Sequence, residues 1–267
     1  MMSIKPGAFR FNTDSMKLEI FRGSANYEGT ASMAGIGTLA AGQWEEIQAT
    51  SPEVQTGGTR GLRMGGTSTS DVIEYYNVES TGNTIDFGNL SAARRAGATV
   101  ASRTKAVIAG GEGPAGGPVN TIEFVTIAST GDAVDFGDLV TAKYAMMAPV
   151  SNSTRGVFCG GYGQPGPFSD SNVIQYITIA QTGNSIDFGD LTYDTTNAGG
   201  CQSSTRGIIA GGQDPAFKNE INFITISTLG NAADFGDLTV ARRTLVGGSN
   251  AIRGLFAGGQ DTSPNAD

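Results

Sequence analysis

A unit that recurs along most of the chain is clearest between residues 154 and 191. It reads TRGVFCGG at 154–161, NVIQYITI at 172–179 and TGNSIDFGDL at 182–191. Gly-Gly pairs recur at 65–66, 110–111, 160–161, 211–212 and 258–259, and DFG tripeptides start at Asp86, Asp135, Asp187 and Asp234. A period of about 50 residues is typical of propellers and solenoid arrays.

Each period contains four short apolar segments bounded by Gly, Asn, Asp or Pro. In the third copy they lie at 143–151, 155–160, 173–179 and 185–189, and we name them A, B, C and D. Four strands in about 50 residues correspond to one propeller blade, and no segment has helical periodicity. Segment C carries apolar residues on both faces, which a strand packed between two neighbouring sheets requires. The sequence therefore predicts an all-β protein built from four-stranded blades.

Composition narrows the classes of partner and of chemistry. The 267 residues carry a net charge of −8 and include no histidine. The acidic balance argues against nucleic acid and anionic membranes as partners, and no apolar run is long enough to span a bilayer. Met1–Phe11 lacks the apolar core of a signal peptide, so we expect synthesis in a cytosol. Without histidine, Ser-His-Asp and Cys-His catalysis are excluded, and zinc or copper sites are disfavoured.

Motifs that suggest catalysis are better explained as scaffold. DFG occurs in four copies without the other kinase motifs. Residues 161–166 match the sequence pattern of a Gly-rich phosphate-binding loop, but Pro165 and the lack of a following helix are incompatible with its geometry. DFGD supplies too few carboxylates for calcium. We therefore expect no catalytic residue, cofactor or metal, and we expect Cys159 and Cys201 to be buried free thiols. The recurring basic residues are predicted to have a structural role in ion pairs or hydrogen bonds, for example with the Asp of DFGD in the next turn or blade, and the alternative is a ring of ligand-binding residues. They are Arg60, Lys105, Arg155, Arg206 and Arg253.

The order of a basic residue, an apolar strand, Gly-Gly, an aromatic strand and a second aromatic resembles the kelch repeat. Tyr76, Phe124, Tyr176 and Phe223 lie near the position of the kelch Tyr, and Phe87, Phe136, Phe188 and Phe235 stand where the kelch Trp would be. The amino-acid sequence of the repeat is also similar to propeller repeats of virion and tail proteins from tailed bacteriophages, including cyanophages. The opening GAFRFNTDSMKLEIFRG with GQWEEI resembles a short β-module of phage fibre proteins.

Residues 1–50 differ from the repeats that occupy 51–267. Residues 7–23 are predicted to form a hairpin, 24–42 a loop, and 43–47 a short strand with the single Trp. The last repeat has segments A and B only, so 17–23 and 43–47 could supply its C and D and place Trp44 at the kelch Trp position. We predict five blades closed by this pairing of the chain ends. The alternative is four blades and a separate N-terminal module for attachment.

The B–C connections are the part of the unit that does not repeat. They read TSTS at 67–70, EGPAGGPV at 112–119, YGQPGPFSDS at 162–171 and QDPAFK at 213–218. Because recognition is usually placed on variable loops of a rigid scaffold, they are the candidate recognition loops. Their candidate contact residues are Tyr162, Phe168, Asp214, Phe217 and Lys218.

Three hypotheses of function remain. The first is a non-enzymatic structural protein of a tailed-phage virion, as a capsid decoration, neck or tail-fibre component. Its expected partners are other virion proteins, a host-surface glycan or further copies of itself, and its place is the virion. The second is a free carbohydrate- or protein-binding propeller. The third is a propeller hydrolase that uses carboxylates alone, because acidic residues are plentiful.

Overall fold

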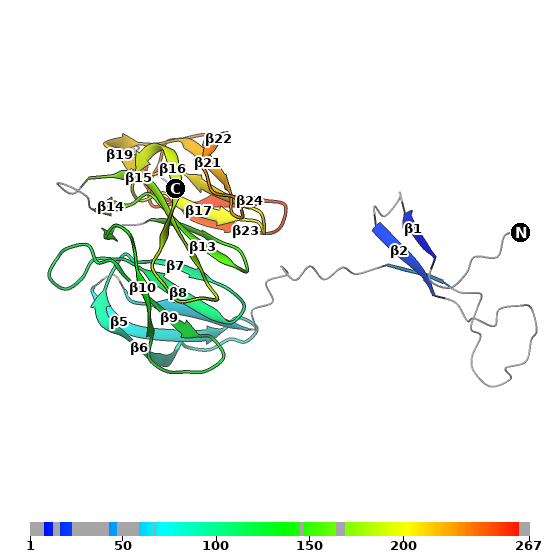
Figure 1. Cartoon of the computed structure of the whole chain (residues 1–267), viewed down its shortest axis with the longest axis horizontal. Helices are drawn as coiled ribbons and strands as arrows, with labels where there is room; N and C mark the ends of the chain where they lie inside the picture. The colour runs from blue at the N-terminus through cyan, green and yellow to red at the C-terminus, as the bar shows by residue number, and fades with distance from the viewer. Residues whose placement is uncertain are drawn as a thin grey trace, which may run out of the picture. The chain divides into compact units, whose positions relative to one another are not determined.

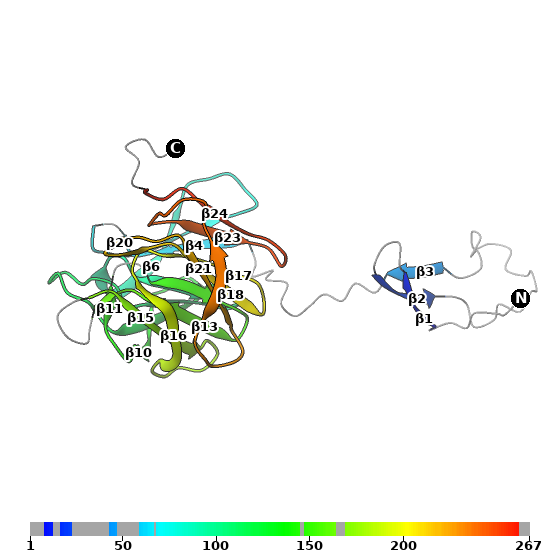
Figure 2. The same cartoon turned by 90° about the horizontal axis from the view of Figure 1, so that it is seen from above.

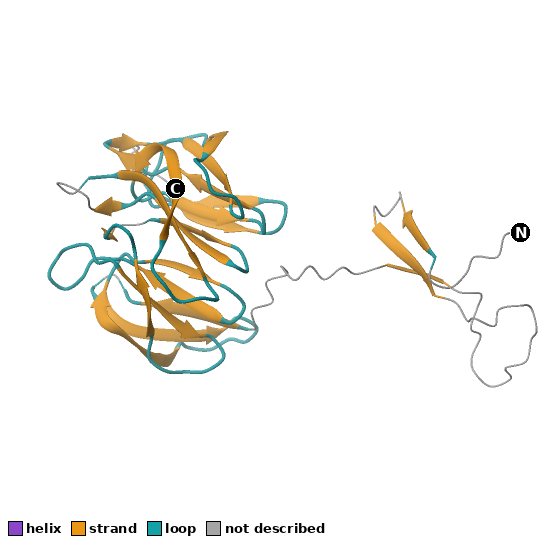
Figure 3. Cartoon of the chain, in the orientation of Figure 1, coloured by secondary structure: helices purple, strands orange, loops and turns teal. Residues whose placement is uncertain are grey.

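The computed structural model describes residues 8–12, 17–22, 43–46, 59–66, 68–144, 147–163 and 169–261. Strands and turns make up these residues (Figure 3), and none of them belongs to a helix that could span a membrane. The predicted all-β class is confirmed for this part of the chain. The chain divides into two compact units, Met1–Val54 and Gln55–Asp267.

The first unit contains one antiparallel sheet in the order β1-β2-β3. Its strands are β1 (Phe9–Asn12), β2 (Lys17–Arg22) and β3 (Gln43–Glu46). The predicted hairpin and the predicted short strand are both confirmed, and Phe21 pairs with Trp44 across β2 and β3. The predicted loop 24–42 and the side chain of Trp44 lie outside the described parts of the structure.

The second unit contains a succession of antiparallel sheets (Figure 1). The first sheet has β4 (Arg60–Met64), β5 (Ser70–Asn77) and β6 (Ile85–Arg94), and the second has β7 (Ala98–Ala101), β8 (Lys105–Ala109), β9 (Thr121–Thr126) and β10 (Val134–Asp138). The third has β12 (Ala148–Ser151), β13 (Arg155–Cys159), β15 (Ser171–Thr178) and β16 (Ile186–Thr195). The fourth has β17 (Gly199–Gln202), β18 (Arg206–Ala210), β21 (Glu220–Thr225) and β22 (Ala233–Asp237), and the final hairpin has β23 (Val246–Ser249) and β24 (Gly254–Ala257).

The predicted strand order A, B, C, D is confirmed in the second, third and fourth sheets, where consecutive strands pair antiparallel. The A strands β7, β12, β17 and β23 contact one another in succession, and Figure 2 shows the final hairpin beside β17. One boundary was wrong. Residues 143–144, predicted as the start of segment A, form a separate strand, β11 (Lys143–Tyr144), because they pair with a loop strand and not with β13.

The core lies between consecutive sheets. We call the face that a sheet turns toward the next sheet its leading face, and the opposite face its trailing face. Val107 and Phe136 on the leading face of the second sheet pack with Phe158 and Ile177 on the trailing face of the third. In the second and third sheets, the C strands β9 and β15 are therefore packed on both faces, as their apolar pattern predicted. Within β13 and β17, Cys159 and Cys201 are buried free thiols, as predicted.

The Phe of each DFG tripeptide belongs to a D strand and to a leading face. Phe87, Phe136 and Phe188 are only 2, 2 and 3% exposed, because the next sheet covers them. Each forms a T-shaped ring contact with an aromatic residue of its C strand, at centroid distances of 6.0, 5.9 and 5.9 Å. The predicted packing role is thus confirmed at these positions. Phe235 keeps its ring contact with Phe223 but is 54% exposed.

Three of the recurring basic residues form hydrogen bonds with the next sheet, as predicted, but their acceptors are backbone carbonyls and not the Asp of DFGD. Arg60 and Arg155 donate to the backbone carbonyls of Ile127 and Ile226, at 2.8 and 3.0 Å, just after the C strand of the next sheet. Lys105 donates to the carbonyl of Ala180 at 3.3 Å. In the described residues these side chains stack on the C-strand aromatic of their own sheet, and the stacking turns them toward a carbonyl and away from the Asp of DFGD.

The predicted closure of a ring by the chain ends is not present among the described strands. β2 has β1 and β3 as its two neighbours, so β1 occupies the place that we expected the last B strand to take. β24 pairs with β23 alone in the described part of the chain. The local pairing is favoured because only four residues separate β1 from β2, and a short loop costs little entropy to close.

Candidate functional site

The B–C loops begin with backbone pairing that repeats from sheet to sheet. Arg95 and Glu112 exchange two backbone hydrogen bonds of 3.0 and 2.8 Å, and Thr196 and Gln213 exchange two of 3.2 and 2.9 Å. In each pair, the first residue precedes an A strand and the second starts the B–C loop that follows. The base of these loops is therefore fixed by the scaffold, while the residues beyond the base are free to differ.

In the third sheet this pairing is extended to two short strands. β11 pairs with β14 (Tyr162–Gly163), so that Tyr144 lies opposite Tyr162. Gly163 then pairs with Ser169 across the loop, and its N–H donates to the Ser169 carbonyl at 3.1 Å. The predicted contact residue Tyr162 thus stands at the base of its loop and is half-buried. Phe168 lies outside the described residues.

The loop of the fourth sheet forms its own small hairpin, of β19 (Gln213–Asp214) and β20 (Ala216–Phe217). The guanidinium of Arg243 lies 5.1 Å from the centre of the Phe217 ring, and it also donates to the side chain of Gln213. The ammonium of Lys218 lies 5.7 Å from the centre of the Tyr193 ring. Cation–π stacking therefore holds both predicted residues, Phe217 and Lys218, in defined positions.

A cluster of carboxylates joins the third and fourth loops. Asp170, at the end of one loop, shares a side-chain hydrogen bond with Asp214 in the other. Burial, the charges of Asp214 and Asp194 and this hydrogen bond together raise the pKa of Asp170 to about 6. Burial also lowers the pKa of Lys143, and the charge of Asp194 opposes that change. The structure thus brings the predicted Asp214 into an acidic group that has a buried amine beside it.

Tyr193 lies beneath these loops on β16. Its hydroxyl oxygen is 3.1 Å from the carbonyl oxygens of both Gly211 and Glu220, so it has an acceptor at the start and at the end of the fourth loop. Burial, followed by the charge of Glu220, raises the pKa of Tyr193. The hydroxyl is therefore protonated at neutral pH, and the carbonyls at the two ends of the loop share its single proton.

Taken together, these loops offer aromatic rings beside carboxylate oxygens. Rings suit stacking on the apolar face of a sugar or packing on protein, and carboxylates accept hydrogen bonds from hydroxyl and amide groups. Among the described side chains, no group of three or more Cys, Asp and Glu residues is arranged to hold a metal ion.

Sequence reasoning missed Asp170, Asp194, Tyr193 and Lys143 as members of this site. A signal for two of them was present in the repeat itself. Tyr193-Asp194 stands where the other units have Ala92-Ala93, Thr141-Ala142 and Val240-Ala241. A polar pair that replaces small residues at one copy of a repeated position indicates a local role that the scaffold does not require.

Comparison with known proteins adds no assignment: no model of a protein family matches the chain, and no curated protein resembles it in sequence at a significant level.

Proposed function

We propose that the chain is a non-enzymatic structural protein of a tailed-phage virion, which presents a rigid β-scaffold for attachment. One contrast carries this proposal. The backbone hydrogen bonds between consecutive sheets repeat, whereas the loops 112–119, 162–171 and 213–218 differ in length and chemistry. Variable loops on a repeated scaffold are the usual place for recognition. The resemblance of the repeat to phage virion proteins suggests the particle as its location.

The finer architecture that we propose is a kelch-like β-propeller with four blades and the inner half of a fifth. The four sheets would be successive blades, and β23 and β24 would be the inner half of the fifth. The strand order A to D and the succession of contacting A strands support this arrangement. Met1–Val54 is proposed as the attachment module, because it forms a compact unit of its own.

Two measurements test the proposal. Mass spectrometry of purified phage particles is expected to detect the chain, and its absence from particles would exclude the virion role. A glycan array and chemical crosslinking to particle proteins, carried out in parallel, identify the partner of the loops. Phe217→Ala is expected to weaken that contact at least fivefold. Val134→Ala is the matched control, because Val134 is 57% exposed on β10 and lies outside the loops. Equal losses for both variants would remove the loops as the contact surface.

A hydrolase is the second candidate, and the Asp170–Asp214 pair favours it. Two carboxyl groups that share a hydrogen bond, one with its pKa raised to about 6, resemble the acid and base pairs of hydrolases. A screen of glycoside and ester substrates tests this candidate. Any turnover should disappear in Asp170→Asn and persist in Asp138→Asn, a change in a D strand away from the loops. Turnover that persists in Asp170→Asn would exclude the pair as catalytic.

A further inference from the structure

Consecutive sheets are joined at their outer strands by a repeated set of hydrogen bonds. Between the third and fourth sheets, Gly230 N–H donates to the Phe188 carbonyl at 2.9 Å, and Ala232 N–H donates to the Asp190 carbonyl at 2.8 Å. In return, Asp190 N–H donates to the side-chain carbonyl of Asn231 at 3.1 Å. The free edge of a D strand thus receives the C–D turn of the next sheet, which presents Gly followed by Asn.

The same set recurs at the two preceding interfaces. Gly183 and Ser185 donate to the carbonyls of Phe136 and Asp138, at 2.7 and 2.8 Å, and Gly131 and Ala133 donate to those of Phe87 and Asn89, at 2.8 Å each. The returning acceptors are the side chains of Asn184 and Asp132. The DFG glycine is required there: a Cβ on Gly137 would lie 2.5 Å from the backbone of Gly183. A D strand of this chain is therefore a receptor for a Gly-Asn or Gly-Asp turn.

The D strand of the fourth sheet carries the same groups with nothing bound to them. Among the described residues, the carbonyls of Phe235 and Asp237 and the N–H of Asp237 make no hydrogen bond of this set. Gly236 has no atom within 4 Å of the position of its Cβ. Arg206 stacks on Phe223 at 4.7 Å, as its counterparts do, but donates to no carbonyl in the described part of the chain.

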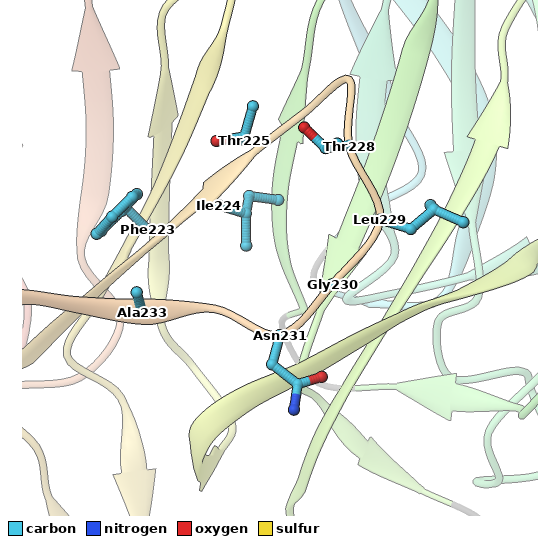
Figure 4. Close-up of a pocket in the computed structure, with 8 residues that line it drawn as sticks. All are labelled: Phe223, Ile224, Thr225, Thr228, Leu229, Gly230, Asn231 and Ala233. Atoms are coloured by element: carbon cyan, nitrogen blue, oxygen red, sulfur yellow. The ribbon is translucent and has the colours of Figure 1, made fainter.

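The fourth sheet also differs in sequence where its leading face is uncovered. Leu229 replaces the Thr of the other turns, Thr81, Thr130 and Thr182, and Ala233 replaces Ile85, Val134 and Ile186. These residues line a cavity of about 170 Å³ beside Phe223 (Figure 4), and Leu229 is 54% exposed. A larger apolar residue on the turn and a smaller one on the strand shape this cavity, which Thr225, Thr228 and Asn231 also line.

A second anchor lies next to this face. The B strands β8, β13 and β18 each pair with a C strand on one edge, whereas β24 pairs only with β23 in the described part of the chain. Its other edge, along Gly254–Ala257, is open to a further antiparallel strand. An incoming hairpin would add its first strand to β24 by backbone hydrogen bonds, and its turn would reach the D strand of the fourth sheet.

The other end of the array argues against a second copy stacked head to tail. At Gly156 and Gly207, a Cβ would lie 2.5 and 2.6 Å from Val100 and Val150 of the preceding sheet. At the equivalent Gly61 it would lie 2.5 Å from the ring of Tyr76, in the same sheet. Tyr76 therefore covers the trailing face of the first sheet, in the place where a preceding sheet would pack.

We propose that the leading face of β21–β22, together with the free edge of β24, binds a β-hairpin of a partner protein whose turn presents Gly-Asn or Gly-Asp. The first strand of this hairpin supplies a backbone carbonyl to Arg206, and its turn supplies two N–H donors to Phe235 and Asp237. The inference goes beyond the proposed function, because this surface is separate from the B–C loops and does not depend on what they bind.

The test measures binding of a hairpin peptide to the full chain. The probe is a fluorescein-labelled peptide with the sequence of residues 171–191, which contains Gly183-Asn184, and binding is followed by fluorescence anisotropy. The control peptide carries Gly183→Pro and Asn184→Ala, which remove one donor and one acceptor. We expect Arg206→Ala to weaken binding about tenfold, because one charge-assisted hydrogen bond corresponds to about that factor. Val78→Ser is the matched control variant, because Val78 follows β5 of the first sheet and is 68% exposed.

Three results would overturn the proposal. The first is equal affinity for the two peptides, and the second is equal affinity of the wild-type chain and Arg206→Ala. The third is an absence of peptide binding. In that case, light scattering measures whether the chain is a monomer or a dimer. A dimer that Phe235→Ser converts to a monomer would assign the face to a second copy, and a monomer would show that no hairpin of this type binds. Far-UV circular dichroism confirms that each variant is folded, and neither result depends on glycan or particle binding.

Discussion

Phe188 and Phe235 occupy the same position in consecutive repeats, and truncating each to alanine measures how much one sheet contributes to its neighbour. Phe188 is 3% exposed and Phe235 is 54% exposed. An aromatic side chain buries about 150–250 Å², so at ~25 cal/mol per Å² its full burial contributes at most about 4–6 kcal/mol. Alanine keeps part of this area and leaves a cavity, so we expect Phe188→Ala to cost about 3–5 kcal/mol.

For Phe235→Ala we expect a loss of about 1–2 kcal/mol, because less than half of the side chain is buried and solvent fills the space that it leaves. Both variants lose a T-shaped ring contact, at centroid distances of 5.9 and 6.2 Å. That contribution therefore cancels in the comparison, and the difference reports the covering by the next sheet.

The assay is equilibrium unfolding in urea, followed by far-UV circular dichroism. Trp44 belongs to the first unit, so tryptophan fluorescence would follow a different part of the chain. An unchanged dependence of the free energy on urea concentration shows that the same cooperative unit unfolds in each variant. If the two variants lose stability equally, within about 0.5 kcal/mol, then the fourth sheet is covered in solution and the reasoning is refuted.

Three further predictions concern the interior and the loops. The pKa of Asp170 is raised from 3.8 to about 6, so this carboxyl ionises at lower pH in the unfolded chain and the stability of the fold should fall as pH rises from about 4 to 6. Asp170→Asn should remove the corresponding fall in melting temperature, and identical pH profiles of the wild-type chain and the variant would contradict the prediction. Gly137→Ala should cost about 1–3 kcal/mol more than Gly236→Ala, because both glycines have positive φ, 143° and 135°, but only the first Cβ meets backbone; equal losses in urea unfolding would count against the turn contact. Burial raises the pKa of Cys159, so an aromatic disulfide reagent at pH 8 should label it only after unfolding, and rapid labelling of the native chain would show that this interior opens.

The sequence alone was enough to predict the repeated elements. Hydrophobic alternation, Gly-Gly pairs and DFG turns are local signals, and they correctly predicted the strands A to D and the burial of Phe136 and Phe188. They also predicted the hairpin and short strand of the first unit. These properties depend on residues that are close in the chain, or on contacts that every copy of the repeat makes in the same way.

The tertiary structure decided what distinguishes one copy from another. Phe235 has the same local sequence as Phe188, but its exposure depends on whether a next sheet lies over it. Arg155 donates a hydrogen bond to a backbone carbonyl of the next sheet and not to the suggested carboxylate, because stacking on Tyr176 fixes the direction of its side chain. Asp170 and Asp214 are 44 residues apart in the chain and meet only because their two loops lie side by side. Burial, partner choice and pKa depend on the surroundings in space, which a repeated sequence does not record.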